Sequence, residues 1–230
     1  MPLCSDTQAQ YGPEDMAAPA FQHNIDLEAS LDSGRLTDVE FKVRSAVFPD
    51  VPESKFRAHK RLLALRSEVF EAMFFGDLAE GDIVNITDVH PKGFEIMLRY
   101  LYSGCARISS VLDALHARAA SRKYLVASLR NGCTEYMRKN LVPSNLFSYL
   151  DYYTLTGEPD RDAYVPVVLQ SWSQSLALQA LSLKNLTQAE EHIFRFVLDN
   201  IRHVREIDVA TALAHKHKNI PRFRVRLDRF

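Results

Sequence analysis

FRAHKRLLALRSEVFEAMFFGDLAE, residues 56–80, is the stretch that determines how the rest of this chain is arranged. It predicts the end of a strand, two short helices and a polar loop. Ser67 suits the N-cap position of the second helix, and Glu68 and Glu71 follow in its first turn, where carboxylates favour the positive end of the helix dipole. Gly76 then predicts the end of that helix.

The second helix combines an apolar face with further apolar residues beyond it. The spacing of one helical face is met by Val69, Phe70, Met73 and Phe74. Phe75 and Leu78 fall on other sides of the same turn, where they stand beside Asp77 and Glu80. Large apolar residues next to carboxylates indicate a binding edge.

This stretch resembles the BTB (POZ) domain family, in which a strand runs into A-H-K/R and then S-x-x-F-x-x-M-F. The matching positions here are His59, Ser67, Phe70 and Met73-Phe74. The likeness extends to both sides, over Leu36-Thr37-Asp38-Val39, then Phe94, Leu98, Tyr100, Leu101, Tyr102 and Gly104, then Ala119-Ala120 and Tyr124-Leu125. Residues 73–80 are most similar to the cytoplasmic BTB-BACK proteins. The resemblance implies an α+β fold, a small sheet with a helical cluster, followed by an all-α BACK-like region.

Local patterns agree with such a fold. Residues 39–43 and 83–86 read as strands, and residues 55–58 as the hairpin partner of the first. A helix is expected from Pro91, and the next one is predicted to bury Leu112, Leu115 and Ala119. The last helix of this domain is predicted to bury residues that step by four, Leu125, Leu129, Cys133 and Met137. Beyond it, the helical pattern continues with Leu146, Tyr149, Leu150 and Tyr153.

Composition bounds the class of protein. The chain has 230 residues, 47% of them hydrophobic, and a net charge of −1, which are ordinary values for a globular protein of one or two domains. No apolar run approaches the length of a membrane span, and the first residues have no basic region or apolar core of a secretory signal. Three widely spaced cysteines without a C-x-x-C pair fit a reducing compartment, so the sequence predicts a cytoplasmic location, with the nucleus as a second candidate.

Four segments are expected along the chain. Residues 1–20 read as a disordered acidic leader, 21–141 as the BTB domain, 142–205 as partial BACK-like helices and 206–230 as a basic tail of unknown structure. The short BACK region and the unfamiliar ending are what a truncated or alternatively spliced product would show. The basic tail lacks the aromatic stacking pattern or zinc-finger spacing of a nucleic-acid binder, so a solvated end is favoured.

The resemblance also implies a homodimer. A leading helix in the family packs against a second protomer, and here its candidate contacts are Phe21, Ile25 and Leu31. The alternative is a helix that only covers its own sheet. Asp38, His59 and Lys60 are expected around the polar pocket at the dimer seam, and Leu63 is assigned to the same interface.

The function implied by the resemblance is that of a substrate adaptor of a cullin-3 ubiquitin ligase. Adaptor-type members carry a hydrophobic-x-Glu triplet after the second helix, matched here by Leu78-Ala79-Glu80. Its leucine would insert into cullin-3 and its glutamate would make a polar contact. The full predicted set is Phe74, Phe75, Asp77, Leu78, Glu80, Tyr102 and Tyr124, the two tyrosines by resemblance only. The alternative for Leu78 is packing on its own helix.

The sequence does not support catalysis. It has no Gly-rich phosphate loop, no G-x-S-x-G and no H-E-x-x-H, and its three cysteines lack the C-x-x-C spacing of zinc ligands. No cofactor or metal is expected. The predicted partners are cullin-3, a second copy of the chain and an unknown substrate protein. The alternative is a BTB scaffold that only dimerises, or one that recruits a transcriptional corepressor.

Overall fold

The structure is a computed structural model that describes residues 27–77, 79–156, 166, 168–182 and 191–217. The chain divides into two compact units, one ending at Met137 and one beginning at Arg138. The predicted limits of the leader, the BACK-like region and the basic tail stay predictions.

A small mixed sheet lies in the first unit. Its strands are β1 (Val39–Val43), β2 (Ser54–Ala58) and β3 (Ile83–Ile86), in the order β2-β1-β3. β2 runs antiparallel to β1, and β3 runs parallel to it, so that Phe41 stands opposite both Phe56 and Val84. Buried residues alternate with more exposed ones along β1 and β3, as expected for strands with one covered face. All three predicted strands are confirmed.

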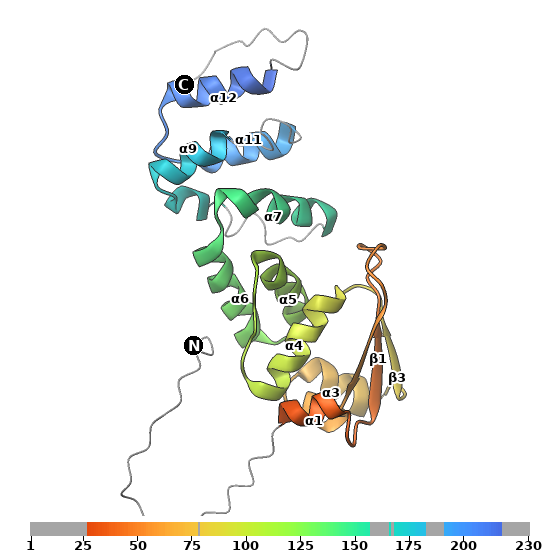
Figure 1. Ribbon diagram of the computed structural model, residues 1–230. Coiled ribbons are helices and arrows are strands. Elements are labelled where there is room, and N and C mark those ends of the chain that lie inside the picture. Colours follow the sequence, from red (N-terminus) through yellow and green to blue (C-terminus); the bar gives the residue numbers. More distant parts are fainter. Residues whose placement is uncertain (1–26, 78, 157–165, 167, 183–190, 218–230) are drawn as a thin grey trace, which may run out of the picture. The chain divides into compact units, whose positions relative to one another are not determined.

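Two helices, α3 (Glu68–Phe75) and α4 (Pro91–Ser103), pack on one face of this sheet, and further helices adjoin them (Figure 1). The further helices are α1 (Leu27–Ser33), α2 (Lys60–Ala64), α5 (Val111–Lys123) and α6 (Ala127–Asn140). α4 packs along α5, α2 packs against α3, and α1 lies on α4. The predicted α+β architecture of a small sheet with a helical cluster is confirmed.

Aromatic rings fill the space between the sheet and the helices. The ring of Phe41 on β1 lies 5.7 Å from Phe70, 6.1 Å from Phe74 and 5.0 Å from Phe94. Phe70 also stacks on Tyr124 at 4.5 Å. Rings at these separations add attraction beyond the area that they bury. This aromatic cluster therefore connects β1, α3, α4 and the end of α5.

Ser67 connects two of these elements through one hydroxyl group. Its oxygen accepts the backbone N–H of Phe70 at 3.4 Å, which confirms the predicted N-cap of α3. The same hydroxyl donates to the carbonyl oxygen of Tyr124 at 2.7 Å. Because Ser67 is buried, water cannot reach these polar groups, and the two bonds give them the partners that water would otherwise supply.

Gly76 ends α3 as predicted, but for a different reason from the one that usually selects glycine. Its backbone is extended, with φ −79° and ψ 178°, rather than left-handed. A Cβ at this position would stand 2.4 Å from the carbonyl oxygen of Ala72. The absence of a side chain therefore allows the chain to leave the helix closely along its last turn.

Two predictions about buried faces are wrong in part. Leu112 is 41% exposed, because α5 turns Val111, Ala114 and Leu115 inward instead. Leu125 is 60% exposed and has φ 53°, so it belongs to the turn before α6 rather than to that helix. The other three residues of the predicted row, Leu129, Cys133 and Met137, are buried as expected.

The second unit is helical over its described residues. It contains α7 (Pro143–Thr156), α9 (Gln174–Ser182), α11 (Glu191–Asn200) and α12 (Glu206–His217), with α9 packed against both α7 and α12. The predicted core residues of α7 are buried, namely Leu146, Tyr149, Leu150 and Tyr153. This region fits a BACK-like arrangement. Within the described ranges, no helix has the length and apolar character needed to cross a membrane.

Two imidazole rings stack at the contact between α4 and α5. His90 and His116 lie 3.7 Å apart with nearly parallel rings, and Phe48 from the β1–β2 hairpin meets both of them edge-on. The helices approach closely here, since a Cβ on Gly93 would stand 2.2 Å from the carbonyl oxygen of His116. His90 also uses Nδ1 to accept the N–H of Lys92, a bond that requires an unprotonated nitrogen.

Burial makes both imidazoles resist protonation. Desolvation lowers the pKa of His116 to about 3, with the neighbouring His90 lowering it further and Asp113 opposing the shift. Desolvation likewise lowers the pKa of His90, against the attraction of Asp113. A histidine in the unfolded chain titrates near 6.5. Below that pH the unfolded state binds more protons than the folded state, so acid favours unfolding.

We therefore expect the free energy of unfolding to fall as the pH drops from 6.5 towards 3, by up to about 1.4 kcal/mol per pH unit from His116 alone. His116→Gln should remove that part of the slope, because glutamine does not titrate. Urea unfolding of both proteins at several pH values measures the difference. Parallel pH profiles for wild type and variant would contradict the assignment.

Candidate functional site

The loop that follows α3 is bonded to the last turns of that helix at Gly76 and at Glu80. The backbone N–H of Gly76 donates to Ala72 at 3.1 Å, and that of Glu80 donates to Met73 at 2.8 Å. These two bonds close the loop back onto the last turn of α3. The loop therefore has a defined backbone position at both ends.

The side chains at this loop form a mixed apolar and acidic surface. Phe75, the last residue of α3, is 55% exposed, and Asp77 and Glu80 are exposed beside it. Leu78, the predicted apolar anchor, lies outside the described residues. We call Phe75, Asp77 and Glu80 the α3 edge. An exposed aromatic ring flanked by carboxylates suits a partner that offers an apolar pocket with polar or basic groups around it.

Tyr124 lies beneath the surface near this edge. Its side chain is buried, and its hydroxyl has no hydrogen-bond partner among the described residues. Burial raises the pKa of Tyr124, and the negative charges of Asp88 and Glu80 raise it further. The Lys123 ammonium lies 5.3 Å from the centre of the Tyr124 ring and is bonded to Asp88 at 2.5 Å.

Three residues predicted to contact cullin-3 are interior residues instead. Phe74 is 6% exposed, Tyr102 is 3% exposed and Tyr124 is fully buried. Phe74 and Tyr124 belong to the aromatic cluster, where their rings pack against Phe70. A side chain enclosed by its own protomer has no surface to offer, so none of these three is available to a partner.

A second group of polar residues gathers where β2 meets α2. His59 Nε2 lies 2.8 Å from the carbonyl oxygen of Arg35, and its Nδ1 lies 2.7 Å from the hydroxyl of Tyr102. A carbonyl can only accept, so Nε2 carries the proton and a neutral His59 accepts from Tyr102 at Nδ1. The backbone N–H of His59 donates to the same hydroxyl at 2.9 Å. Burial, more than the nearby Asp38 charge, raises the pKa of Tyr102 to about 12.

Lys60 joins this group to two carboxylates. Its backbone N–H donates to Asp38 at 2.7 Å, and its ammonium group pairs with Asp82 at 2.8 Å. The ammonium also lies 5.5 Å from the centre of the Phe74 ring. Asp38, His59 and Lys60, which were predicted to lie around one polar pocket, are thus brought together. We call these three residues, with Asp82 and Tyr102, the polar seam.

Two members of the polar seam are not predicted from the sequence, and one neighbouring residue has a different place from the predicted one. Asp82 was not singled out, although its position directly before β3 could have placed it beside the start of β1. Tyr102 was assigned to a different surface. Leu63, predicted at the dimer interface, lies on the buried side of α2, so it is part of the protomer core and not available to a second copy.

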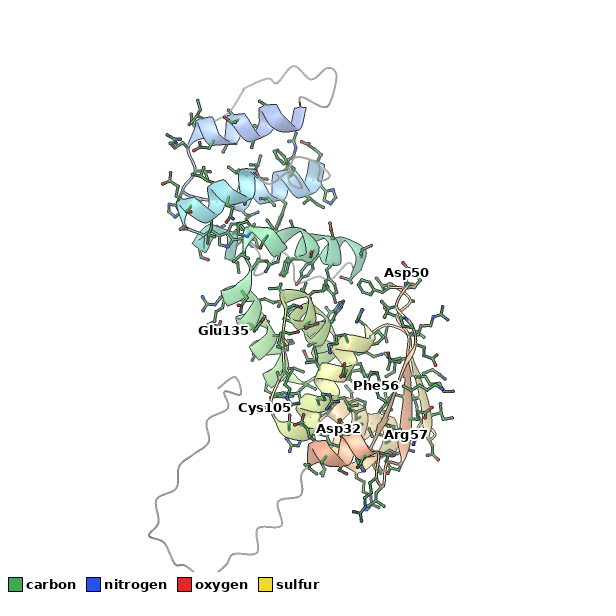
Figure 2. The ribbon with its side chains drawn as sticks, in the orientation of Figure 1. Asp32, Asp50, Phe56, Arg57, Cys105 and Glu135 are labelled. Carbon is green, nitrogen blue, oxygen red and sulfur yellow. The ribbon has the colours of Figure 1, made fainter. Side chains whose placement is uncertain are left out.

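A groove of about 410 Å³ opens between α1, β1, β2 and α4. Leu31, Phe56 and Leu98 supply apolar lining, while the charged residues Asp32, Glu40, Lys55, Arg57, Glu95 and Arg99 also line it. Arg99 pairs with Asp32 at 2.9 Å and with Glu95 at 3.4 Å. Figure 2 shows Asp32, Phe56 and Arg57 near one another at this side of the sheet. Of the three predicted contacts on the leading helix, Leu31 lines this groove, and Phe21 and Ile25 lie outside the described residues.

The described residues contain no group of three or more His, Cys, Asp or Glu positioned to hold a metal ion. The surfaces that the structure brings together are the α3 edge, the polar seam and the groove beside α1. All three are built from side chains suited to protein contact.

Comparison with known proteins gives a consistent result. A family model described as the BTB/POZ domain matches residues 27–141. BTB/POZ domain-containing protein 6-B of Danio rerio is 38% identical over 180 residues, which cover 71% of this chain and 36% of the relative. BTB/POZ domain-containing protein 3 of Homo sapiens is 36% identical over 125 residues, which cover 54% of this chain and 24% of the relative. The chain thus spans about a quarter to a third of the length of these relatives.

Among solved structures, the BTB domain of zebrafish PATZ1 is similar with a TM-score of 0.39 and 25% sequence identity. The match covers 50% of this chain and 86% of that one.

The hydroxyl group of Tyr124 offers a test of this geometry. We expect Tyr124→Phe to leave the free energy of unfolding unchanged or to raise it by about 1 kcal/mol, because the change removes a buried polar group without a partner. Tyr102→Phe is the matched control. It makes the same chemical change but removes a hydroxyl bonded twice to His59, so it should cost about 1–3 kcal/mol. Urea unfolding compares the two, and an equal loss in both would contradict the assignment of Tyr124.

Proposed function

Because the chain belongs to the BTB/POZ domain family, we propose that it is a dimeric substrate adaptor of a cullin-3 ubiquitin ligase. In this proposal the α3 edge, together with Leu78, binds cullin-3. The family as a whole consists of protein-interaction modules, which agrees with a chain whose candidate surfaces are suited to protein contact.

The observation that carries the proposal is the exposure of Phe75 at the end of α3. A ring that is 55% exposed, in a helix whose Phe70 and Phe74 are buried, is not needed by the protomer core. Beyond the ring, the backbone N–H of Glu80 donates to the carbonyl oxygen of Met73 in α3. A partner that covered the ring would gain its apolar area, and a ring carried by a helix costs little backbone entropy to bind.

The carboxylates of the α3 edge have a different role in this proposal. Asp77 and Glu80 are exposed, and charges of this kind contribute orientation and association rate more than affinity. Glu80 is the acidic residue of the hydrophobic-x-Glu triplet, and Leu78 would be the second apolar anchor. In this proposal Phe75 and Leu78 supply most of the binding free energy, and Asp77 and Glu80 orient cullin-3 as it binds.

We expect Phe75→Ala combined with Leu78→Ala to weaken cullin-3 binding by about thirtyfold or more, since truncating a central anchor costs about 2 kcal/mol. Leu65→Ala is the matched control, because Leu65 is an apolar residue that is 85% exposed and lies outside the α3 edge. Binding is measured by calorimetry with purified cullin-3 and the full chain, and the melting temperature is recorded for every variant.

Equal affinity for wild type and the Phe75/Leu78 variant would overturn the adaptor proposal. A chain that binds corepressor peptides but not cullin-3 would support the alternative of a corepressor-recruiting scaffold. A loss of binding that accompanies a large drop in melting temperature would assign these residues to the core instead.

The dimer rests on a separate observation. None of the seven residues of α1 is fully buried, although the helix lies on α4 and borders the groove. Leu31 is only partly covered, and Leu36 after the helix is 82% exposed. A second copy that packed against α1 and Leu36 would cover this apolar area, which agrees with the common homodimerisation of BTB domains.

Light scattering on the full chain should therefore give twice the protomer mass of 26.2 kDa. Leu31→Glu should shift the protein towards a single protomer, because the new carboxylate would be desolvated beside Asp32 and Glu95. Leu65→Glu serves as the control and should leave the mass unchanged. A wild-type protein of 26.2 kDa at micromolar concentration, or a dimer that is insensitive to Leu31→Glu, would contradict the proposed interface.

A further inference from the structure

The face of the sheet that points away from the helices is strongly cationic. Successive outward positions on β1 are Glu40 and Lys42, and Arg44 follows at the same side of the chain between the buried residues Val43 and Ser45. On β2 the outward residues are Lys55 and Arg57, which together with Glu40 also reach the rim of the groove beside α1. Four basic side chains therefore share this face with a single carboxylate from the two strands.

The strand register places two of the cations directly opposite each other. Lys42 pairs with Lys55, whereas Glu40 pairs with Arg57. On its other side, Lys42 stands next to the uncharged Asn85 of β3. Like charges at directly opposed positions of a sheet are destabilising, and opposite charges there are favourable. The protomer therefore carries an uncompensated lysine pair at the centre of this face.

Charge compensation from within the described residues is slight. Lys42, Arg44 and Lys55 have no carboxylate within the 4.0 Å of an ion pair among these residues. Arg57 reaches Glu40 only at 3.7 Å, and its own side chain is 69% exposed. An exposed ion pair with this N–O distance contributes little to the stability of the fold. The cationic charge is thus available to a ligand.

The neighbouring strand gives this face an apolar border. β3 lies at one side of the sheet, and its outward residues are Ile83 and Asn85. Ile83 is 56% exposed and stands opposite Glu40. The hairpin turn at the other end of the face carries the exposed acidic residues Asp50 and Glu53 (Figure 2 labels Asp50). The cationic area is therefore short and bounded.

We propose that this cationic sheet face binds a short acidic peptide segment of a partner protein. Carboxylates of the peptide would pair with Lys42, Lys55 and Arg44, and an apolar residue next to them would contact Ile83. An anion placed between Lys42 and Lys55 removes their repulsion on binding. That relief adds to the new ion pairs.

The composition of the face favours a peptide over a nucleic acid or a lipid surface. The aromatic residues Phe41 and Phe56 alternate with the cationic ones and point to the opposite side of the sheet, so no ring on β1, β2 or β3 is placed to stack on bases. Glu40, Asp50 and Glu53 would repel a continuous row of phosphates or anionic headgroups. A segment with two or three carboxylates avoids those positions.

This inference does not depend on cullin-3 binding, because the residues involved are distinct from the α3 edge. It gives the protein a second partner surface on strands rather than on helices. The two surfaces can be tested separately, since variants of one leave the other intact.

The test uses the full chain and a short fluorescein-labelled peptide of Glu, Val and Gly, with fluorescence anisotropy as the readout. We expect binding at about 0.05 M salt and its loss at about 1 M salt, where screening acts over about 3 Å. Lys42→Gln combined with Lys55→Gln should weaken binding by about tenfold. The same variant should melt at the wild-type temperature or above it, because it removes the opposed charges. Arg61→Gln, which neutralises an exposed cation on α2, should change neither property.

Controls with other ligands decide between classes of partner. The same peptide with Gln in place of Glu should not bind. Duplex DNA or vesicles containing phosphatidylserine that bind more tightly than the acidic peptide, with the same sensitivity to the lysine variant, would overturn the proposal in favour of a polyanion surface. Equal peptide affinity for wild type and the lysine variant, or no binding of the acidic peptide at about 1 mM, would also overturn it.

Discussion

The buried hydroxyl group of Ser67 is the contact on which the arrangement of the first unit depends. It accepts the N–H of Phe70 at the start of α3 and donates to the carbonyl of Tyr124 at the end of α5. The two elements are far apart in sequence, and the stacked rings of Phe70 and Tyr124 lie directly beside this link. One polar contact and one ring contact therefore set where α3 begins and which side it buries.

The exposure of the α3 edge follows from this constraint. Once Phe70 and Phe74 point into the aromatic cluster, the next residue, Phe75, must leave on another side of the helix. Gly76 then lets the chain turn closely along Ala72, and the backbone N–H of Glu80 donates to Met73. The apolar ring is thus presented by a helix, which lowers the entropic cost of binding a partner.

Much of the fold could be predicted because local patterns and chain order agree here. The Ser67 cap, the alternation of Val39–Val43 and the helical faces of α3 and α7 were all readable. The sequence pattern does not reveal which apolar residues of a face are buried, since Leu112 and Leu125 are apolar and still exposed. Which helix turn points inward depends on close contacts such as Gly93 against His116, and these arise only once α4 and α5 are packed.

The candidate site was predictable in the same partial way. Phe75, Asp77 and Glu80 lie at the surface where the pattern placed them, while Phe74, Tyr102 and Tyr124 serve the interior. A family motif does not distinguish a residue that touches a partner from a residue that packs in the interior of its own protomer. The cationic sheet face has no motif at all, because it appears only when the register sets Lys42 opposite Lys55.

Hydrogen exchange of the full chain with and without cullin-3 tests most directly whether the α3 edge binds this partner. Slowed exchange at residues 73–80 in the presence of cullin-3 is the expected result. Protection confined to other segments, or no protection at saturating cullin-3, would contradict it.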